Sequence, residues 1–470
     1  MNRLPENSLL GWARSWEGRA LILFVCGSMF LNGENAMQVL GVLMCGVFLM
    51  GCACGRVKGA SLYRLAPEVK FYALWVLWAG ATGPIAAVNL MTFWESYRTV
   101  LQMLVMIVVV YCILCMRRQT LAGVFLAVCC GGGVLVGSAL LGVDSLTASL
   151  ESKDQATGLT DNANTLGMCL VWATLSFLLL LGFAGRMRKW VYAVGLLAAP
   201  FFVYVLLASA SRKSFVAFLL LLGGWATFGS ATRKTLADHV KRSILVVLAI
   251  AVLWGGLSFI MQNTLLGRRL QLFSNKSNGS LTDAVDGEER YSMYVEGLRM
   301  FLENPITGVG LDNFSELFWS HKYSHSDYIE PLATTGLVGF VLYQSFYFFI
   351  LRRAIGLLEH VSDEAVVYRL KIIIIGIVTI MLMGLGSPHY QSLPVFILLT
   401  SFCVYTSDIE QETGSSRAFR REVPKQSRLC SPGCVARLAS GSFLGTAAKA
   451  PVISGSEKGD FGNPGLPRSR

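Results

Sequence analysis

The segment Tyr323-Ser-His-Ser-Asp-Tyr-Ile-Glu-Pro-Leu-Ala-Thr-Thr-Gly-Leu-Val-Gly339 leads from a long polar interval directly into an apolar run. The polar interval covers about residues 263–330 and is flanked by hydrophobic segments on both sides. Its other informative part starts at Asp286-Gly-Glu-Glu-Arg290 and continues to Asn304-Pro-Ile-Thr-Gly-Val-Gly310. Because the rest of the chain is largely apolar, this interval holds most of the polar side chains that could carry chemistry.

The composition is that of an integral membrane protein. Of the 470 residues, 54% are hydrophobic and only 15% are charged, whereas soluble proteins average about 25% charged residues. The net charge of +11 would suggest a nucleic-acid partner in a soluble chain. In a membrane protein, Lys and Arg instead accumulate in cytoplasmic loops. We therefore expect membrane lipids, and no nucleic acid, as partners.

Apolar runs long enough to cross a bilayer, which takes about 20 residues, recur along the chain. The sequence predicts an all-α integral membrane protein with about twelve transmembrane helices, at 18–32, 37–55, 71–91, 99–116, 120–142, 164–184, 190–208, 214–231, 243–261, 332–351, 370–387 and 393–407. The domains expected from this pattern are helices 1–9 in residues 1–261, a large and partly helical loop at 262–331, and helices 10–12 in residues 332–407. Residues 408–470 are rich in Gly, Ser, Pro and Arg, and are predicted to form a disordered tail.

The distribution of cations predicts the orientation. Pairs such as Arg117-Arg118, Arg233-Lys234 and Arg352-Arg353 fall on every second connection, and the alternate connections are nearly free of Lys and Arg. Under the positive-inside rule, both termini are cytoplasmic and the loop 262–331 faces outward. The first apolar run lacks a clear cleavage site and is expected to be retained.

The cysteines give no indication of a disulfide framework or a metal site. Most of the 12 lie inside apolar runs, and the interval 263–330 contains none. Cys430 and Cys434 lie in the tail without partner His or Cys pairs. We expect no metal and no cofactor.

Two adjacent cations, Arg212 and Lys213, open an apolar segment on the outer side. They oppose the positive-inside rule, and they lie at a helix N-terminus, where each positive charge costs about 0.3–1 kcal/mol. One interpretation is that both side chains simply extend to the membrane interface. The other is an anion site, in which helix N–H groups and a guanidinium hold a phosphate.

Within the polar interval, Asp286 and Glu289 have the spacing of a capping box at the start of a helix. Pro305 and the glycines that follow it are expected to end that helix. Arg290 lies at the edge of the helix's apolar stripe, one turn before Tyr294. It could form a structural salt bridge or contribute to a site.

His325 could accept or donate a proton near neutral pH, and Asp327 could orient it. The alternative is that His325 only caps the start of the following helix. His321 and Lys322 are competing candidates close by. Asn164, at the end of Gly158-Leu-Thr-Asp-Asn-Ala-Asn164, is either part of a helix cap or a contact to substrate.

In this combination the chain resembles the O-antigen ligase and polymerase superfamily of polytopic bacterial membrane glycosyltransferases. Four segments in the family's order carry the resemblance: Gly158…Asn164, Ser211-Arg212, Arg290…Asn304-Pro305…Gly308-Val-Gly310, and His325-Ser-Asp-Tyr…Gly336-Leu-Val-Gly339. The family's two essential arginines correspond to Arg212 and Arg290, and its loop histidine to His325. The residue after that histidine is usually Asn in the family and is Ser326 here.

The resemblance implies metal-independent transfer of a glycan from undecaprenyl diphosphate to an acceptor on the periplasmic face of the inner membrane. Its implied catalytic residues are Arg212, Arg290 and His325, with Lys213, Asn164, Asp327 and Lys322 as substrate-binding candidates. The acceptor is the lipid A core in ligases and another lipid-linked repeat unit in polymerases. The placement of the histidine favours the ligase type.

Two other classes remain as alternatives. A polysaccharide-lipid transporter would carry ionisable residues near the middle of its spans, but 99–116, 120–142 and 243–261 contain none. A purely structural membrane protein offers no reason for the pair Arg212-Lys213.

Overall fold

The computed structural model describes residues 12–13, 15–30, 34–54, 65–142, 159–160, 162–228, 281–390 and 392–422. Within these ranges the regular structure is all helical, without a strand. Seven of the described helices are long and apolar enough to cross a membrane. This confirms an all-helical protein with multiple membrane helices. The predicted span 243–261 and the segment 262–280 lie outside the described residues.

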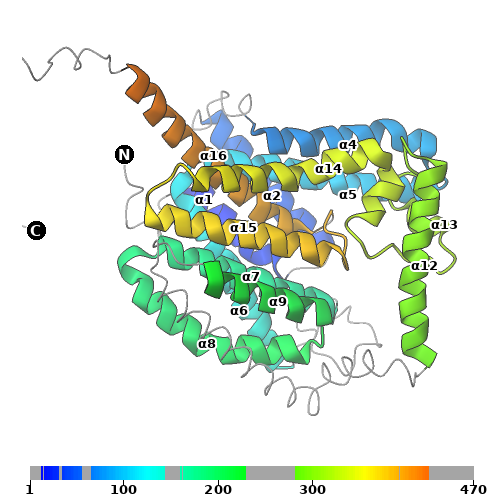
Figure 1. Cartoon of the computed structure of the whole chain (residues 1–470), viewed down its shortest axis with the longest axis horizontal. Helices are drawn as coiled ribbons and strands as arrows, with labels where there is room; N and C mark the ends of the chain where they lie inside the picture. Colours follow the sequence, from blue (N-terminus) through cyan, green and yellow to red (C-terminus); the bar gives the residue numbers. More distant parts are fainter. Residues whose placement is uncertain are drawn as a thin grey trace, which may run out of the picture. The chain divides into compact units, whose positions relative to one another are not determined.

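The helices occur in the following order (Figure 1). They are α1 (Trp16–Ser28), α2 (Glu34–Ala53), α4 (Pro67–Ala86), α5 (Leu90–Met116), α6 (Leu121–Leu140), α7 (Ala163–Phe183), α8 (Arg188–Ala208), α9 (Arg212–Phe228), α12 (Leu281–Glu303), α13 (Asn313–Leu317), α14 (Ile329–Leu358), α15 (Glu364–Gly384) and α16 (Leu393–Glu422). The chain consists of two compact units, Met1–Ser415 and Ser416–Arg470.

Helix α7 packs among four other helices of the first unit. It packs against α6, α8, α9 and α15, and its side chains are apolar around its whole circumference, as expected for a buried helix. Helix α8 differs, because only 11% of its most apolar 18-residue stretch is buried. Trp190, Leu196 and Leu197 of α8 are exposed, as expected for a helix that faces lipid.

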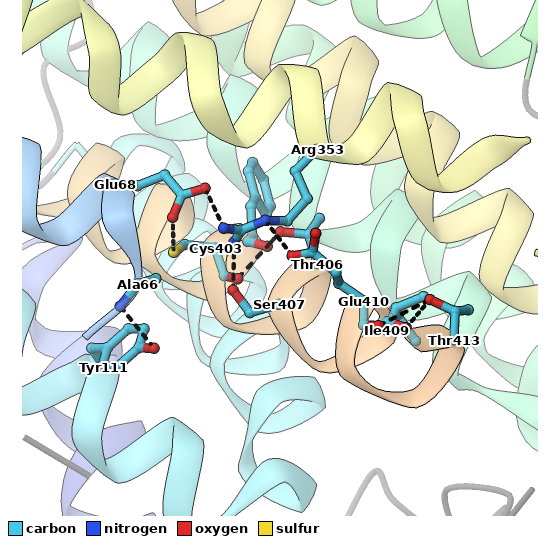
Figure 2. Close-up of polar contacts among 11 residues, drawn as sticks. Ala66, Glu68, Tyr111, Arg353, Cys403, Thr406, Ser407, Ile409, Glu410 and Thr413 are labelled. Carbon is cyan, nitrogen blue, oxygen red and sulfur yellow. Dashed lines mark hydrogen bonds and ion pairs between the residues drawn. The ribbon is translucent and has the colours of Figure 1, made fainter. Parts of the chain in front are cut away.

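Helix α16 extends further than the sequence predicted. It continues to Glu422, so residues 408–422, predicted as the start of a disordered tail, are helical. Ion pairs to earlier segments stabilise this extension. Asp408 pairs with Arg118 at 3.0 Å. Glu410 pairs with Arg353 at 3.0 Å (Figure 2). Arg353 also contacts the buried carboxylate of Glu68 at 2.9 Å. Composition alone does not reveal such long-range partners. Residues 423–470 lie outside the described part.

Helix α14 consists of two helical segments joined at Gly336, whose backbone angles are φ 66° and ψ −173°. A break in a helix frees carbonyl and N–H groups that need other partners. Here the segment 304–310 and one tryptophan supply them: Val309 N to Ala333 O (3.0 Å), Gly310 N to Thr334 O (2.9 Å), Leu337 N to Pro305 O (2.8 Å) and Trp78 Nε1 to Thr335 O (3.0 Å). The two glycine-containing motifs of the sequence therefore form one unit.

Glycine is required on both sides of this contact. Gly308 and Gly336 both have φ 66°, in the left-handed region that other residues rarely adopt. A Cβ atom on Gly308 would overlap the backbone of Thr334, and one on Gly336 would overlap the backbone of Ile306. The two backbone segments lie so close together that neither position has room for a side chain.

We expect Gly336→Ala to destabilise the protein, by about 1–3 kcal/mol from backbone strain and by more from the overlap with Ile306. Gly356→Ala, in the same helix, is the matched control, because a Cβ there meets nothing within 4 Å. Thermal unfolding in detergent measures both effects. A similar Tm for the two variants would contradict the assigned role of Gly336.

Candidate functional site

The start of α9 forms the first part of the candidate site. A tight turn with Ala210 at φ 50° separates α8 from α9, and the carbonyl of Ser211 accepts the N–H of Phe215 at 3.0 Å. The hydroxyls of Ser211 and Ser214 are hydrogen-bonded at 2.9 Å. Both serines lie against Gly167 of α7, where a Cβ would overlap Ser214. The starts of α7 and α9 are therefore adjacent.

The adjacent cations of α9 point in different directions, because consecutive residues of a helix are rotated by about 100°. Arg212 is exposed. The ammonium of Lys213, which precedes the apolar part of α9, donates to the carbonyl of Gly386 at 3.2 Å. Burial, and then the nearby charge of Arg290, lowers the pKa of Lys213 to about 8. Lys213 and Arg290 therefore lie within electrostatic range of each other.

Helix α12 carries Arg290 and starts at Leu281, earlier than predicted. Asp286 is consequently inside the helix and is not its N-cap. Arg290 is exposed, and one turn later the hydroxyl of Tyr294 donates to the carbonyl of Leu385 at 2.8 Å. This bond attaches α12 to the connection between α15 and α16.

The turn before α14 holds His325. The N–H of Ser324 donates to Glu330 Oε2 at 2.7 Å, which closes the turn, and His325 lies within it at φ 55°. The His325 ring is half-buried and contacts the ring of Tyr323 in a tilted arrangement, with 4.2 Å between centroids and 50° between planes. The hydroxyl of Ser326 accepts the first N–H groups of the helix, those of residues 328 and 329, both at 3.3 Å. Ser326 therefore supports the start of α14, whose N-cap residue is Tyr328.

Tyr323 connects this turn electrostatically to α12. Burial and then the charge of Glu330 raise the pKa of Tyr323, while the nearby guanidinium of Arg290 opposes this shift. Arg290 therefore lies within electrostatic range of both Lys213 and Tyr323.

Asp327, predicted to orient His325 or to bind substrate, is 3% exposed. Its Oδ1 accepts from the hydroxyl of Tyr343 and from the backbone N–H of His389, at 2.8 and 2.7 Å, and its Oδ2 accepts from the hydroxyl of Tyr347 at 3.3 Å. Burial raises the pKa of Asp327 to about 7, although these hydrogen bonds oppose the shift. Both oxygens are bonded within the chain, so the carboxylate holds neighbouring segments together.

The remaining predicted residues lie around these groups. Asn164 is exposed near the start of α7, and the cap of that helix is Asn162, whose side chain accepts the N–H of Thr165 at 2.9 Å. Lys322 is exposed. His321 is also exposed, and its Nδ1 lies 3.3 Å from the carbonyl of Ser315.

Sequence reasoning missed the connection between α15 and α16, because the predicted span 370–387 included its first part. The cluster of Gly384, Gly386 and Pro388 was the signal for a turn there. His389 in this connection is fully buried, and burial lowers its pKa to about 4. Its Nε2 donates to the carbonyl of Ile380 at 3.2 Å, and its Nδ1 has no hydrogen-bond partner among the described residues.

Together these groups lie where α7, α9, α14 and α16 begin and α15 ends, and Figure 1 shows α12 running crosswise to α14. Lys213 and Arg290 could bind a polyanion, and the half-buried imidazole of His325 could accept a proton. Among the residues that the structure describes, no three His, Cys, Asp or Glu side chains are grouped as a metal site would require.

Residues 196–344 match the family model described as O-antigen ligase. The resemblance found in the sequence is confirmed over this range, which contains Arg212, Lys213, Arg290 and the turn around His325. A search of curated proteins found no match.

Proposed function

We propose that this chain, whose residues 196–344 match the O-antigen ligase family, is a glycosyltransferase of the ligase type. It would transfer a glycan from undecaprenyl diphosphate to the lipid A core. The observation that carries the proposal is that Arg290 of α12 lies within electrostatic range of both Lys213 of α9 and Tyr323, whose ring contacts His325.

The cations suit the leaving group. As the bond between the anomeric carbon and the phosphate oxygen breaks, the diphosphate takes the electron pair and gains negative charge. A preorganised donor aimed at such charge typically contributes about 3–4 kcal/mol to transition-state stabilisation. Arg290 and Arg212 can each offer two parallel N–H groups to a phosphate, and Lys213 adds a third charge at the same end of the unit. No metal is needed for this role.

His325 suits the acceptor. An acceptor hydroxyl attacks the anomeric carbon, forms the new glycosidic bond and loses its proton, which His325 takes up. The half-buried position next to Tyr323 leaves part of the ring accessible. Asn164 and Lys322 are exposed polar residues that would contact the glycan.

The repeat-unit polymerase is the alternative within the same family, and it would use the same residues. Deletion in the native host followed by a gel of surface polysaccharide distinguishes the two. Bare lipid A core together with long lipid-linked polymer indicates a ligase, whereas a single repeat unit on the core indicates a polymerase. Normal polysaccharide would contradict both.

A purified assay tests the chemistry itself. Lipid-linked donor and core acceptor are mixed with the protein in detergent, with and without EDTA. We expect equal transfer in both samples, because Arg212, Lys213 and Arg290 supply the positive charge. Loss of transfer in EDTA would show that the metal-independent mechanism is wrong.

The proposed orientation places both termini in the cytoplasm and the site on the periplasmic face of the bacterial inner membrane. The alternation of Lys and Arg along the chain supports it. We expect a reporter fused near Ser320 to be active only outside the cytoplasm, and one fused after Lys234 to be active only inside. A cytoplasmic signal at Ser320 would contradict the proposal.

The lowered pKa of Lys213 predicts a pH dependence. Its ammonium is charged below about pH 8 and neutral above it, so its attraction for a diphosphate is lost as the pH rises. We expect kcat/KM for the donor to fall above about pH 8. The fall in kcat should begin at higher pH, because bound diphosphate favours the charged ammonium.

Lys213→Arg is the control for this profile, because arginine stays charged throughout the range. It should remove the decline above pH 8 in kcat/KM. An unchanged decline in this variant would assign the titration to another group.

A further inference from the structure

The connection between α15 and α16, residues 384–390, plays no part in the proposed chemistry, yet groups from three separate elements bind to it. These are the ammonium of Lys213 to Gly386 O (3.2 Å), the hydroxyl of Tyr294 to Leu385 O (2.8 Å) and the N–H of Asp327 to Gly384 O (2.7 Å). Three consecutive carbonyls thus hold the start of α9, the helix of Arg290 and the turn of His325. We call residues 384–390 the α15–α16 loop.

Asp327 forms hydrogen bonds with the loop near both of its ends. Its N–H donates to Gly384, and its carboxylate accepts the N–H of His389 at 2.7 Å. A Cβ on Gly384 would lie only 3.0 Å from Cβ of Asp327, so the two backbones are in close contact. The hydroxyls of Tyr343 and Tyr347 hold the same carboxylate from within α14.

The hydrogen bonds between Asp327 and the α15–α16 loop therefore connect His325, on the acceptor side of the proposed reaction, with Lys213 and Arg290 on the donor side. His325 is two residues before Asp327, so a movement of Asp327 reaches it directly through the chain. Lys213 and Tyr294 move with the loop that Asp327 holds, and Tyr294 lies one turn after Arg290. A misplacement of about 1 Å can cost about 100-fold in rate.

We propose that Asp327, acting through the α15–α16 loop, is a positioning residue that sets His325 against the cations Lys213 and Arg290. This rests on the proposed function. It assigns Asp327 a role in aligning donor and acceptor sites, with no contact to either substrate.

The test uses graded variants in the purified transfer assay. Asp327→Asn keeps the shape and one acceptor oxygen, and Tyr343→Phe removes only the 2.8 Å bond to the carboxylate. We expect each to lower kcat at least tenfold, with unfolding temperatures near that of the wild type. Tyr328→Phe is the matched control, because its hydroxyl donates to Met381 O at 2.8 Å, which lies outside the loop. It should stay within twofold of the wild type.

A double-mutant cycle separates positioning from a general structural role. If Asp327 acts in part by placing His325, Asp327→Asn should lower the residual activity of His325→Ala by a smaller factor than it lowers the activity of the wild type. A loss that multiplies onto His325→Ala would overturn the proposal, as would wild-type kcat in both Asp327→Asn and Tyr343→Phe. If the wild-type protein itself transfers no glycan, the proposed function fails and this inference fails with it.

Discussion

Replacing His325 with alanine is expected to lower the rate of glycan transfer by about 100- to 10,000-fold, the range that general acid–base groups contribute. The affinity for the lipid-linked donor should stay within about twofold. The reason is that His325 is proposed to remove the acceptor's proton, whereas the diphosphate is held by cations from α9 and α12. Transfer in detergent and a separate donor-binding measurement report the two quantities.

His321 provides the matched control. It also has a positive φ, of 53°, but it is exposed, and its Nδ1 lies 3.3 Å from the carbonyl of Ser315. We expect His321→Ala to retain near wild-type transfer. Full activity in His325→Ala together with loss in His321→Ala would show that the family's histidine had been assigned to the wrong residue.

Arg290→Ala is expected to reduce kcat by about 100- to 1,000-fold, the cost of removing one donor that stabilises charge in the transition state. Arg290→Lys should lie between this variant and the wild type, because lysine keeps the charge and loses the planar pair of N–H groups. The corresponding changes at Arg212 should follow the same order. Single-turnover transfer rates measure these effects.

Arg299, on the same helix, is the control for charge alone. It is exposed and pairs with Glu296 and Glu303, at 3.0 Å from its Nε and 3.3 Å from its Nη1 respectively. Exposed pairs of this kind contribute little, so Arg299→Ala should transfer normally. Equal losses at Arg290 and Arg299 would indicate that α12 has only a structural role.

Local patterns in the sequence were enough to predict a helical membrane protein. A bilayer requires about 20 apolar residues per span, and backbone groups in lipid must bond within the segment, so run length alone identifies helices such as α7 and α15. The glycines at 308 and 336 were likewise visible as motifs. Their partnership was not, because it consists of backbone hydrogen bonds between segments that are separate in sequence.

Only the tertiary structure decided where several elements end and which side chains meet. Helix α16 continues past residue 407 because Arg118 and Arg353 lie beside its acidic residues. Asp327 was predicted to orient His325 or bind substrate, but the sequence did not reveal that Tyr343, Tyr347 and His389 hydrogen-bond its carboxylate. Lys213 and Arg290 come within electrostatic range because Lys213 of α9 and Tyr294 of α12 bind adjacent carbonyls of residues 385 and 386. Such contacts depend on the folded positions of distant segments, which no local pattern encodes.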